Sequence, residues 1–140
     1  MLIDTLGEYS DAQALTATAI STNVIDHGGS SPQIGVGSPL WVHFNVVVAA
    51  DFSQADETYS FAFETDDNAA HSSAVILNTR AILAAVLVIG YKFSMSVPGE
   101  AMQRYSAVRY TLGGTSPTLT IDAHLSSQQM PQWTSQPDAI

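Results

Sequence analysis

Hydrophobic side chains recur at every second residue along several short segments, and this period restricts the fold more than any other feature of the chain. Between residues 58 and 65, Tyr59, Phe61 and Phe63 alternate with small or polar residues. The segment Tyr91–Val97 repeats the pattern. Successive side chains of a β-strand point to opposite faces, so both segments predict strands with one buried face.

Turn-forming Gly, Pro, Asp and Asn separate these segments from other strand-like runs. Further strands are expected within Asp11–Asp26, Leu40–Ala49, Ala74–Leu77, Arg104–Leu112 and Thr118–Leu125, and Ala81–Ile89 fits a strand or a helical turn. Seven or more short strands with turns every eight to twelve residues predict an all-β fold. The expected architecture is a jelly-roll-like antiparallel β-sandwich with extended N- and C-terminal segments.

Three parts of the chain are expected: an N-terminal extension (1–10), the sandwich domain (11–127) and a C-terminal arm (128–140). The apolar strand faces predict the core, which comprises Val46, Phe61, Phe63, Phe93, Met95, Leu119 and Ile121. Trp41 lies inside a strongly apolar strand and is also expected in the core. His43 and His124 lie opposite apolar residues and are therefore expected at the surface or in an interface.

The charge balance restricts the possible partners. Thirteen Asp and Glu stand against four Lys and Arg, which gives a formal net charge of −9. Binding to nucleic acid depends on clustered basic groups, so nucleic acid and anionic membranes are poor partners. The longest apolar run, Ala81–Ile89, is much shorter than the roughly 20 residues that a membrane helix needs. The segment Met1–Asp4 does not have the pattern of a secretory signal, and the absence of Cys excludes disulfides.

No motif in the sequence predicts catalysis, a cofactor or a metal. Asp66, Asp67 and Asn68, with Glu64 and His71 nearby, carry groups that can bind Ca²⁺, but the spacing of a calcium loop is absent. Asp and Asn are equally common in turns. The four His lack metal-ligand spacing, and no G-x-S-x-G nucleophile motif occurs. We therefore expect a protein that is not an enzyme.

Both ends of the chain carry apolar residues within polar or turn-rich sequence. The predicted interface residues are Leu2, Ile3, Met130, Pro131, Trp133 and Ile140. Buried aromatic anchors dominate the energy of many interfaces, and this favours Trp133 as the anchor of an arm that contacts a partner. A tail that folds back onto its own sandwich is the alternative.

Three stretches together resemble the capsid cement (decoration) proteins of tailed bacteriophages, of the type first described in a Bordetella podovirus. Residues 11–26 (DAQALTATAISTNVID) are similar to the N-terminal block of that family. Residues 63–70 (FETDDNAA) resemble its acidic stretch, with Ala70 where an aromatic residue is usual. Residues 104–114 (RYSAVRYTLGG) resemble its R-Y hairpin. The order and spacing of the three stretches carry the resemblance.

The resemblance implies a jelly-roll-like subunit that forms a homo-oligomer, dimer or trimer. It also implies a position on the outer capsid surface of the virion, after synthesis in the bacterial cytoplasm. The protein would bind the major capsid protein and clamp neighbouring capsid subunits, without catalysis. Repeated weak contacts around a shell would then add up through avidity.

Two other classes of function remain open from the residues. A carbohydrate-binding β-sandwich module requires exposed aromatic side chains, and the candidates are Tyr9, Tyr59, Tyr91, Tyr105 and Tyr110. A hydrolase requires two carboxylates about 5 to 9 Å apart in a cleft. Such pairs form in space and leave no mark in the sequence.

Overall fold

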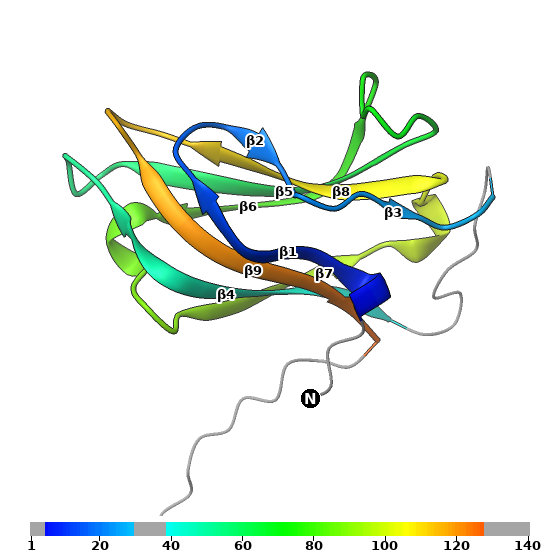
Figure 1. Ribbon diagram of the computed structural model, residues 1–140, viewed down its shortest axis with the longest axis horizontal. Helices are drawn as coiled ribbons and strands as arrows, with labels where there is room; N and C mark the ends of the chain where they lie inside the picture. Colours follow the sequence, from blue (N-terminus) through cyan, green and yellow to red (C-terminus); the bar gives the residue numbers. More distant parts are fainter. Residues whose placement is uncertain (1–4, 30–38, 128–140) are drawn as a thin grey trace, which may run out of the picture.

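The computed structural model describes residues 5–29 and 39–127, and these residues form two antiparallel β-sheets packed face to face (Figure 1). The strands are β1 (Glu8–Leu15), β2 (Ala19–Ile20), β3 (Ile25–Asp26), β4 (Leu40–Asp51), β5 (Thr58–Asp66), β6 (Val75–Leu83), β7 (Lys92–Val97), β8 (Tyr105–Leu112) and β9 (Thr118–Ser126). The 3₁₀ turns are η1 (Thr5–Gly7), η2 (Ala84–Val86) and η3 (Gly99–Ala101). Within the described ranges, no helix has the length and apolar character needed to cross a membrane.

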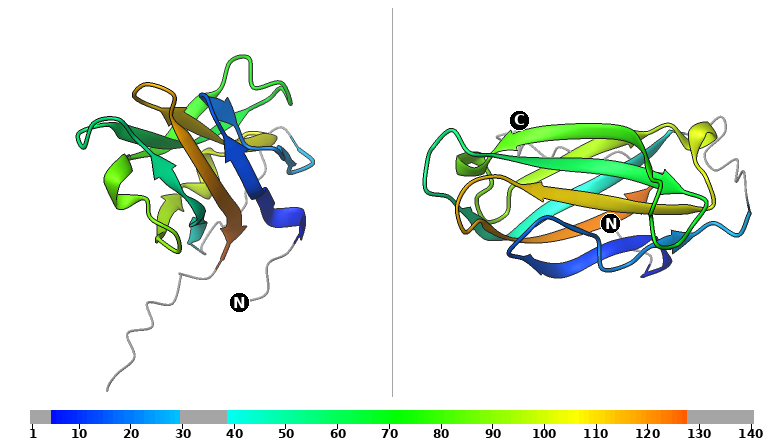
Figure 2. Two further views of the ribbon diagram at one scale, coloured as in Figure 1. Left: turned by 60° about the vertical axis from the view of Figure 1, so that its left-hand side comes forward. Right: turned by 90° about the horizontal axis from the view of Figure 1, so that it is seen from above.

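The strand order confirms the predicted β-sandwich. Sheet A has the order β1-β9-β4-β7, and sheet B has the order β2-β8-β5-β6, with β3 also paired to β8. The chain changes sheet between β4 and β5 and again at each connection from β6 to β9 (Figure 2). With β2 and β3 taken as two pieces of one interrupted strand, this is the order of a jelly roll.

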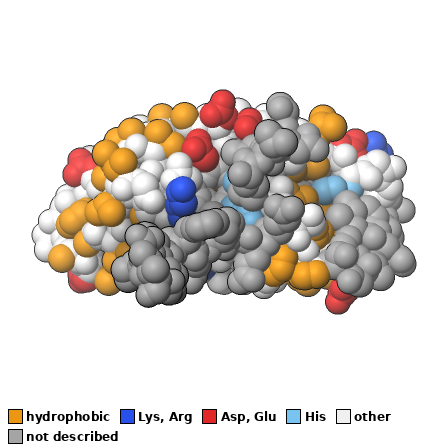
Figure 3. All heavy atoms as spheres, turned by 90° about the horizontal axis from the view of Figure 1, so that it is seen from below, with side chains coloured by type: hydrophobic (Ala, Val, Ile, Leu, Met, Phe, Trp, Pro, Cys, Tyr) orange, Lys and Arg blue, Asp and Glu red, His pale blue; other side chains and the backbone are white. Residues whose placement is uncertain are grey.

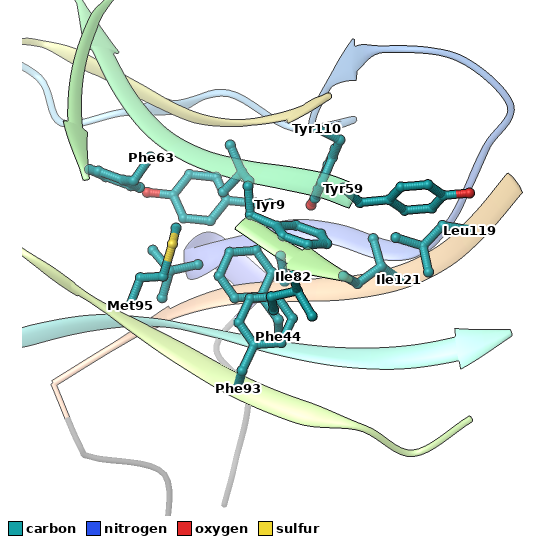
Figure 4. Packing of buried hydrophobic residues seen from close by; sticks show 14 of the residues in the cluster. Tyr9, Phe44, Tyr59, Phe63, Ile82, Phe93, Met95, Tyr110, Leu119 and Ile121 are labelled. Atoms are coloured by element: carbon teal, nitrogen blue, oxygen red, sulfur yellow. The ribbon is translucent and has the colours of Figure 1, made fainter. Parts of the chain in front are cut away.

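The predicted core is confirmed. All seven expected core residues are buried between the sheets, as are the side chains of Tyr9, Tyr59 and Tyr110 (Figure 4). The rings of Phe44 and Phe93 stack with centroids 4.5 Å apart, and Phe61 meets Phe93 edge-on at 4.9 Å. Aromatic pairs in these geometries add to the free energy gained from burial alone.

The N-terminal part of the fold differs from the prediction in two respects. Strand β1 begins at Glu8 and Tyr9 is fully buried, so the sandwich includes residues that we had assigned to the 1–10 extension. The expected single run within residues 11–26 is divided into β1 in sheet A and β2 and β3 in sheet B. The chain passes from one sheet to the other around residues 16–18, which are all exposed and add nothing to the core.

Strand β6 and Trp41 provide the other two corrections. We expected separate segments at Ala74–Leu77 and Ala81–Ile89, but β6 runs without a break through the polar residues Asn78–Arg80. Its ladder with β5 continues there because a strand at the edge of a sheet tolerates polar side chains. Trp41 is only half-buried. It pairs with Ser96 and Ser126, on the face of sheet A away from the core.

Candidate interaction surface

The six predicted interface residues lie outside the described part of the chain. Leu2 and Ile3 precede residue 5, and Met130, Pro131, Trp133 and Ile140 follow residue 127. Their role as contacts stays a prediction. The surface that the described residues form must therefore be examined for other contact sites.

Large hydrophobic side chains are exposed together at one end of the sandwich. Figure 3 shows apolar side chains gathered at the end where the β6–β7 connection lies. We call this surface the apolar end patch, and it comprises Val48, Phe52, Leu83, Val86, Val88 and Ile89. Ile89 is 71% exposed and Val88 is 55% exposed. Contiguous exposed patches of this kind mark sites of association in soluble proteins.

The backbone beneath the apolar end patch is held by a regular set of hydrogen bonds. Ala50 N–H donates to the carbonyl of Leu87 at 2.9 Å, and Gly90 N–H donates to the carbonyl of Val46 at 2.8 Å. These two bonds lie on either side of Val48 and place it next to the loop. Ala84 N–H donates to the carbonyl of Glu57 at 2.8 Å and fixes the start of η2. A loop fixed in this way loses little conformational entropy when a partner covers it.

A buried chain of polar groups joins β1, the segment after β3, and β8. The Ser106 hydroxyl lies 2.7 Å from the Tyr9 hydroxyl and 2.7 Å from His27 Nε2. Burial lowers the pKa of His27 and raises that of Tyr9 far above its usual range. A serine beside a histidine can act as a nucleophile in an open site. Ser106 is completely buried between the sheets, and this favours a structural role for the contact.

The acidic stretch after β5 is engaged in bonds to its own chain. Asp66 accepts hydrogen bonds from the backbone N–H groups of Ser73 at 2.8 Å and Asn68 at 3.0 Å, and the Ser73 bond is the main cause that lowers the pKa of Asp66. Glu64 is buried and receives two bonds of 2.8 Å from Arg109. His71 Nδ1 lies 3.4 Å from the same carboxylate. In the described part of the chain, no three His, Asp or Glu side chains form a group able to hold a metal ion.

The expectation for His43 is wrong, since its side chain is completely buried. Its Nδ1 lies 2.8 Å from the Ser94 hydroxyl, and its ring meets that of His124 with centroids 5.3 Å apart. His124 is half-buried on the paired strand β9. Burial is the main cause that lowers the pKa of His124, and the nearby His43 lowers it further.

A small depression beside β1 and β9 brings carboxylates together. It is lined by Glu8, Ser10, Asp11, Asp122, Ala123 and His124. Asp122 uses one oxygen to accept the Ala12 N–H at 2.7 Å and the other to accept Asn45 Nδ2 at 3.2 Å. The Asp122 carboxylate is therefore committed to holding β1 and β4 against β9.

The tyrosines do not form the exposed aromatic row that a carbohydrate-binding module uses. Tyr9, Tyr59 and Tyr110 have no exposed surface. Tyr91 and Tyr105 are half-buried. Arg104 lies 5.0 Å over the Tyr105 ring and covers part of it. The structure thus offers sugar-stacking surface at two tyrosines at most.

Sequence reasoning missed the apolar end patch, although the sequence carried a signal for it. The run Ala81–Ile89 is uncharged, and it was assigned only as a strand or a helical turn. A half-buried strand at the edge of a sandwich buries every second side chain. An unbroken apolar run must therefore leave several large side chains exposed, unless a partner covers them.

Comparison with known proteins places this sandwich in a family. The model of the family described as Bbp16 matches residues 9–125, from β1 to near the end of β9. No curated protein matches the chain. Because the match spans most of the chain and nearly all of both sheets, the protein belongs to the Bbp16 family, which carries the name of a Bordetella phage protein.

Proposed function

We propose that the protein is a capsid cement protein, which binds the outer surface of a tailed-phage shell and stabilises contacts between major capsid protein subunits. The observation that carries this proposal is membership of a phage protein family over residues 9–125. The resemblance of three separate stretches to podovirus cement proteins supports it further. In this role the protein acts by binding, in the virion and without catalysis.

The surface of the sandwich is suited to such a role. The apolar end patch exposes Val88 and Ile89 on a backbone that is already hydrogen-bonded, so docking requires little ordering. A shell presents many equivalent sites, and contacts that are weak one by one become strong together. The net charge of −9 favours a position outside the shell rather than on the packaged DNA.

The partners proposed are the major capsid protein and further copies of this chain. The predicted arm 128–140 would add an aromatic anchor, Trp133, to contacts made by the sandwich. Contact with nucleic acid or membrane has no part in the proposal.

Binding to empty shells tests the proposed function. Shells assembled from the major capsid protein of the same phage are mixed with the purified protein, and the bound fraction is measured by co-sedimentation. We expect saturable binding and a higher temperature of shell disruption. A protein that neither binds such shells nor changes their stability would contradict the cement role.

A matched pair of variants tests whether the apolar end patch takes part. Ile89→Asp places a charge in the patch, whereas Thr111→Asp places the same charge at an exposed position of β8 in sheet B. We expect Ile89→Asp to weaken shell binding by at least about tenfold, as loss of an interface anchor does. Thr111→Asp should bind like the unmodified chain. Equal binding by both variants would exclude the patch from the contact.

A further inference from the structure

Strand β6 leaves one edge of sheet B open. Among the described residues, β6 pairs only with β5, and no strand lies on its other side (Figure 2, right). The strand is nine residues long, contains neither Pro nor Lys, and has Arg80 as its one charged residue. Ile76 is 58% exposed and Leu83 is 47% exposed along it. An edge with these properties is a template for a further strand.

The neighbouring edge, that of β7 in sheet A, is blocked by side chains of β6. Asn78 Nδ2 donates to the carbonyl of Ser96 at 2.7 Å, and Arg80 donates to the carbonyl of Ser94 at 3.4 Å. Arg80 also lies 5.4 Å over the ring of Phe93. Two backbone acceptors of β7 are therefore occupied, and β6 is the edge that remains available on this side of the sandwich.

The stretch of sequence that contains β6 lacks acidic residues. Residues 68–99 contain no Asp or Glu and include Arg80 and Lys92, two of the four basic residues of the chain. In the β5–β6 ladder the one acidic residue opposite β6 is Glu64, and Arg109 neutralises it with two hydrogen bonds. Two copies that each carry a net charge of −9 repel one another over about 10 Å at moderate salt. Contact along β6 brings together a stretch without Asp or Glu, and this limits that repulsion.

The centre of β6, Asn78–Arg80, is compatible with an antiparallel copy of itself. When two copies run antiparallel with Thr79 opposite Thr79, Asn78 faces Arg80 and the two arginines avoid one another. Further out, Ile82 is buried in the core of its own copy and takes no part in the pairing. An antiparallel pair of identical strands is related by a two-fold axis, which is the symmetry of a closed dimer.

The ladder with β5 shows where such a pairing can be regular. Residues Asn78–Leu83 pair in register with Thr58–Phe63, whereas a bulge follows at Leu77. A bulge bends its strand, so regular pairing with a second copy is expected around Asn78–Arg80.

We propose that two copies of this chain associate through their β6 edges, antiparallel and centred on Thr79, so that sheet B continues from one copy into the other. A second copy fits this edge because its central residues Asn78–Arg80 pair without placing like charges opposite one another, and because the stretch 68–99 that carries β6 contains no Asp or Glu. The inference depends on the proposed function in one respect: the dimer would be the form of the protein that binds the shell. Pairing in solution can be tested without any shell.

Charge exchange at the centre of the strand tests both the edge and the register. Thr79→Lys and Thr79→Asp each place like charges directly opposite one another across the two-fold axis, and like charges in that position oppose pairing. We expect the unmodified chain to sediment as a dimer at tens of micromolar and each variant to dissociate about tenfold more readily or worse. An equimolar mixture of the two variants should recover the dimer, because Lys then faces Asp.

Thr111 provides the control, since it is exposed on the same face of sheet B but lies on β8, away from the β6 edge. Thr111→Lys and Thr111→Asp should leave the dimer unchanged. The cysteine-free chain allows a second measurement. Cα atoms opposite one another in antiparallel strands are about 4.5 or 5.5 Å apart, and both separations permit a disulfide. Thr79→Cys should therefore oxidise to a covalent dimer much faster than Thr111→Cys.

The outcomes separate this inference from the proposed function. An unmodified chain that stays monomeric at high micromolar concentration would overturn the inference, as would a dimer that Thr79→Lys leaves intact. Loss of shell binding by Thr79→Lys in a monomeric chain would instead assign the edge to the capsid protein. Failure to bind shells would refute the cement role and leave the dimer result as it stands.

Discussion

The two long edges of sheet B differ in whether other strands cover them. On the β8 side, the short strands β2 and β3 cover the edge. Arg104 binds Asp26 through two bonds of 2.9 Å, and Ser21 exchanges hydrogen bonds with Val108. On the β6 side nothing in the described chain covers the edge. One edge is covered by further strands, and the other is open in the described part of the chain.

This difference indicates that the β6 edge is the one that binds a partner. Exposed edge strands promote aggregation, and proteins usually protect them with short strands, charges or covering segments. The β8 side has all three kinds of protection. An open edge on the same sheet is therefore more simply explained as a contact site than as an unprotected defect. The acid-free sequence around β6 agrees with that explanation.

The largest effect on stability is expected at Phe61, which lies on the central strand between the two edges of sheet B. Phe61 lies on β5, between β8 and β6, and packs against Phe44, Phe93 and Tyr110. Phe61→Ala should lower the free energy of unfolding by about 3 to 5 kcal/mol, because it empties a buried aromatic site. Urea denaturation followed by tryptophan fluorescence measures the loss. A change below about 1 kcal/mol would mean that β5 does not hold the two edges together.

Removal of residues 128–140 tests whether the open edge is sufficient for association. We expect the sandwich to stay folded, because β9 ends at Ser126. Association or shell attachment should weaken by roughly 2 kcal/mol or more if Trp133 is an anchor. Analytical ultracentrifugation and shell binding of the truncated chain measure the two effects separately. Unchanged shell affinity, or an unfolded truncated chain, would contradict the arm hypothesis.

Removal of the Arg109–Glu64 ion pair, which joins β8 to β5, should lower the free energy of unfolding by an intermediate amount. Arg109→Ala leaves the carboxylate of Glu64, which is 2% exposed, without its partner. Loss of one partner of a fully buried pair costs about 3 to 5 kcal/mol, and the partial exposure of Arg109 reduces the expected cost to about 2 kcal/mol. Denaturation midpoints of Arg109→Ala and of the control Arg109→Met/Glu64→Leu should separate lost charge pairing from lost packing. If the double variant is less stable than Arg109→Ala, the buried charge is not the cause.

The sequence predicted the fold well where period and turns agree. The alternating aromatic residues of β5 and the apolar residues of β7 and β9 were all assigned to the correct face, because a strand in a two-layer sandwich has one buried side. The predicted strand boundaries were wrong where the chain passes from one sheet to the other, as it does between β1 and β2. Threonine and alanine carry no signal that distinguishes a continuous strand from a crossing.

The surfaces could be predicted only in part. His43 and Trp41 lie on neighbouring rungs of the same outward face, yet His43 is buried and Trp41 is half-exposed. Burial on an outer face depends on which segments cover it, and periodicity does not contain that information. The open edge of β6 likewise follows from strand order, which arises from pairing between distant segments. Only the lack of acidic residues around it was visible in the sequence itself.

The smallest effect is expected at the exposed end of the closed edge, and it should depend on pH. The hydrogen bonds from Arg104 lower the pKa of Asp26 from 3.8 to about 2. A carboxylate with a lower pKa in the folded state stabilises the fold above its unfolded pKa, and this contribution disappears as the pH falls toward the folded pKa. The unfolding temperature of Asp26→Asn should therefore lie slightly below that of the unmodified chain at pH 5 to 7 and converge with it between about pH 4 and pH 2. Because both side chains are nearly half exposed, added salt should also reduce the difference. The control Asp56→Asn alters an exposed turn residue that bonds no Arg side chain in the part of the chain that the structure describes, and it should leave the unfolding temperature close to that of the unmodified chain. A difference for Asp26→Asn that persists at pH 2 would mean that the ion pair does not fasten β3 to β8.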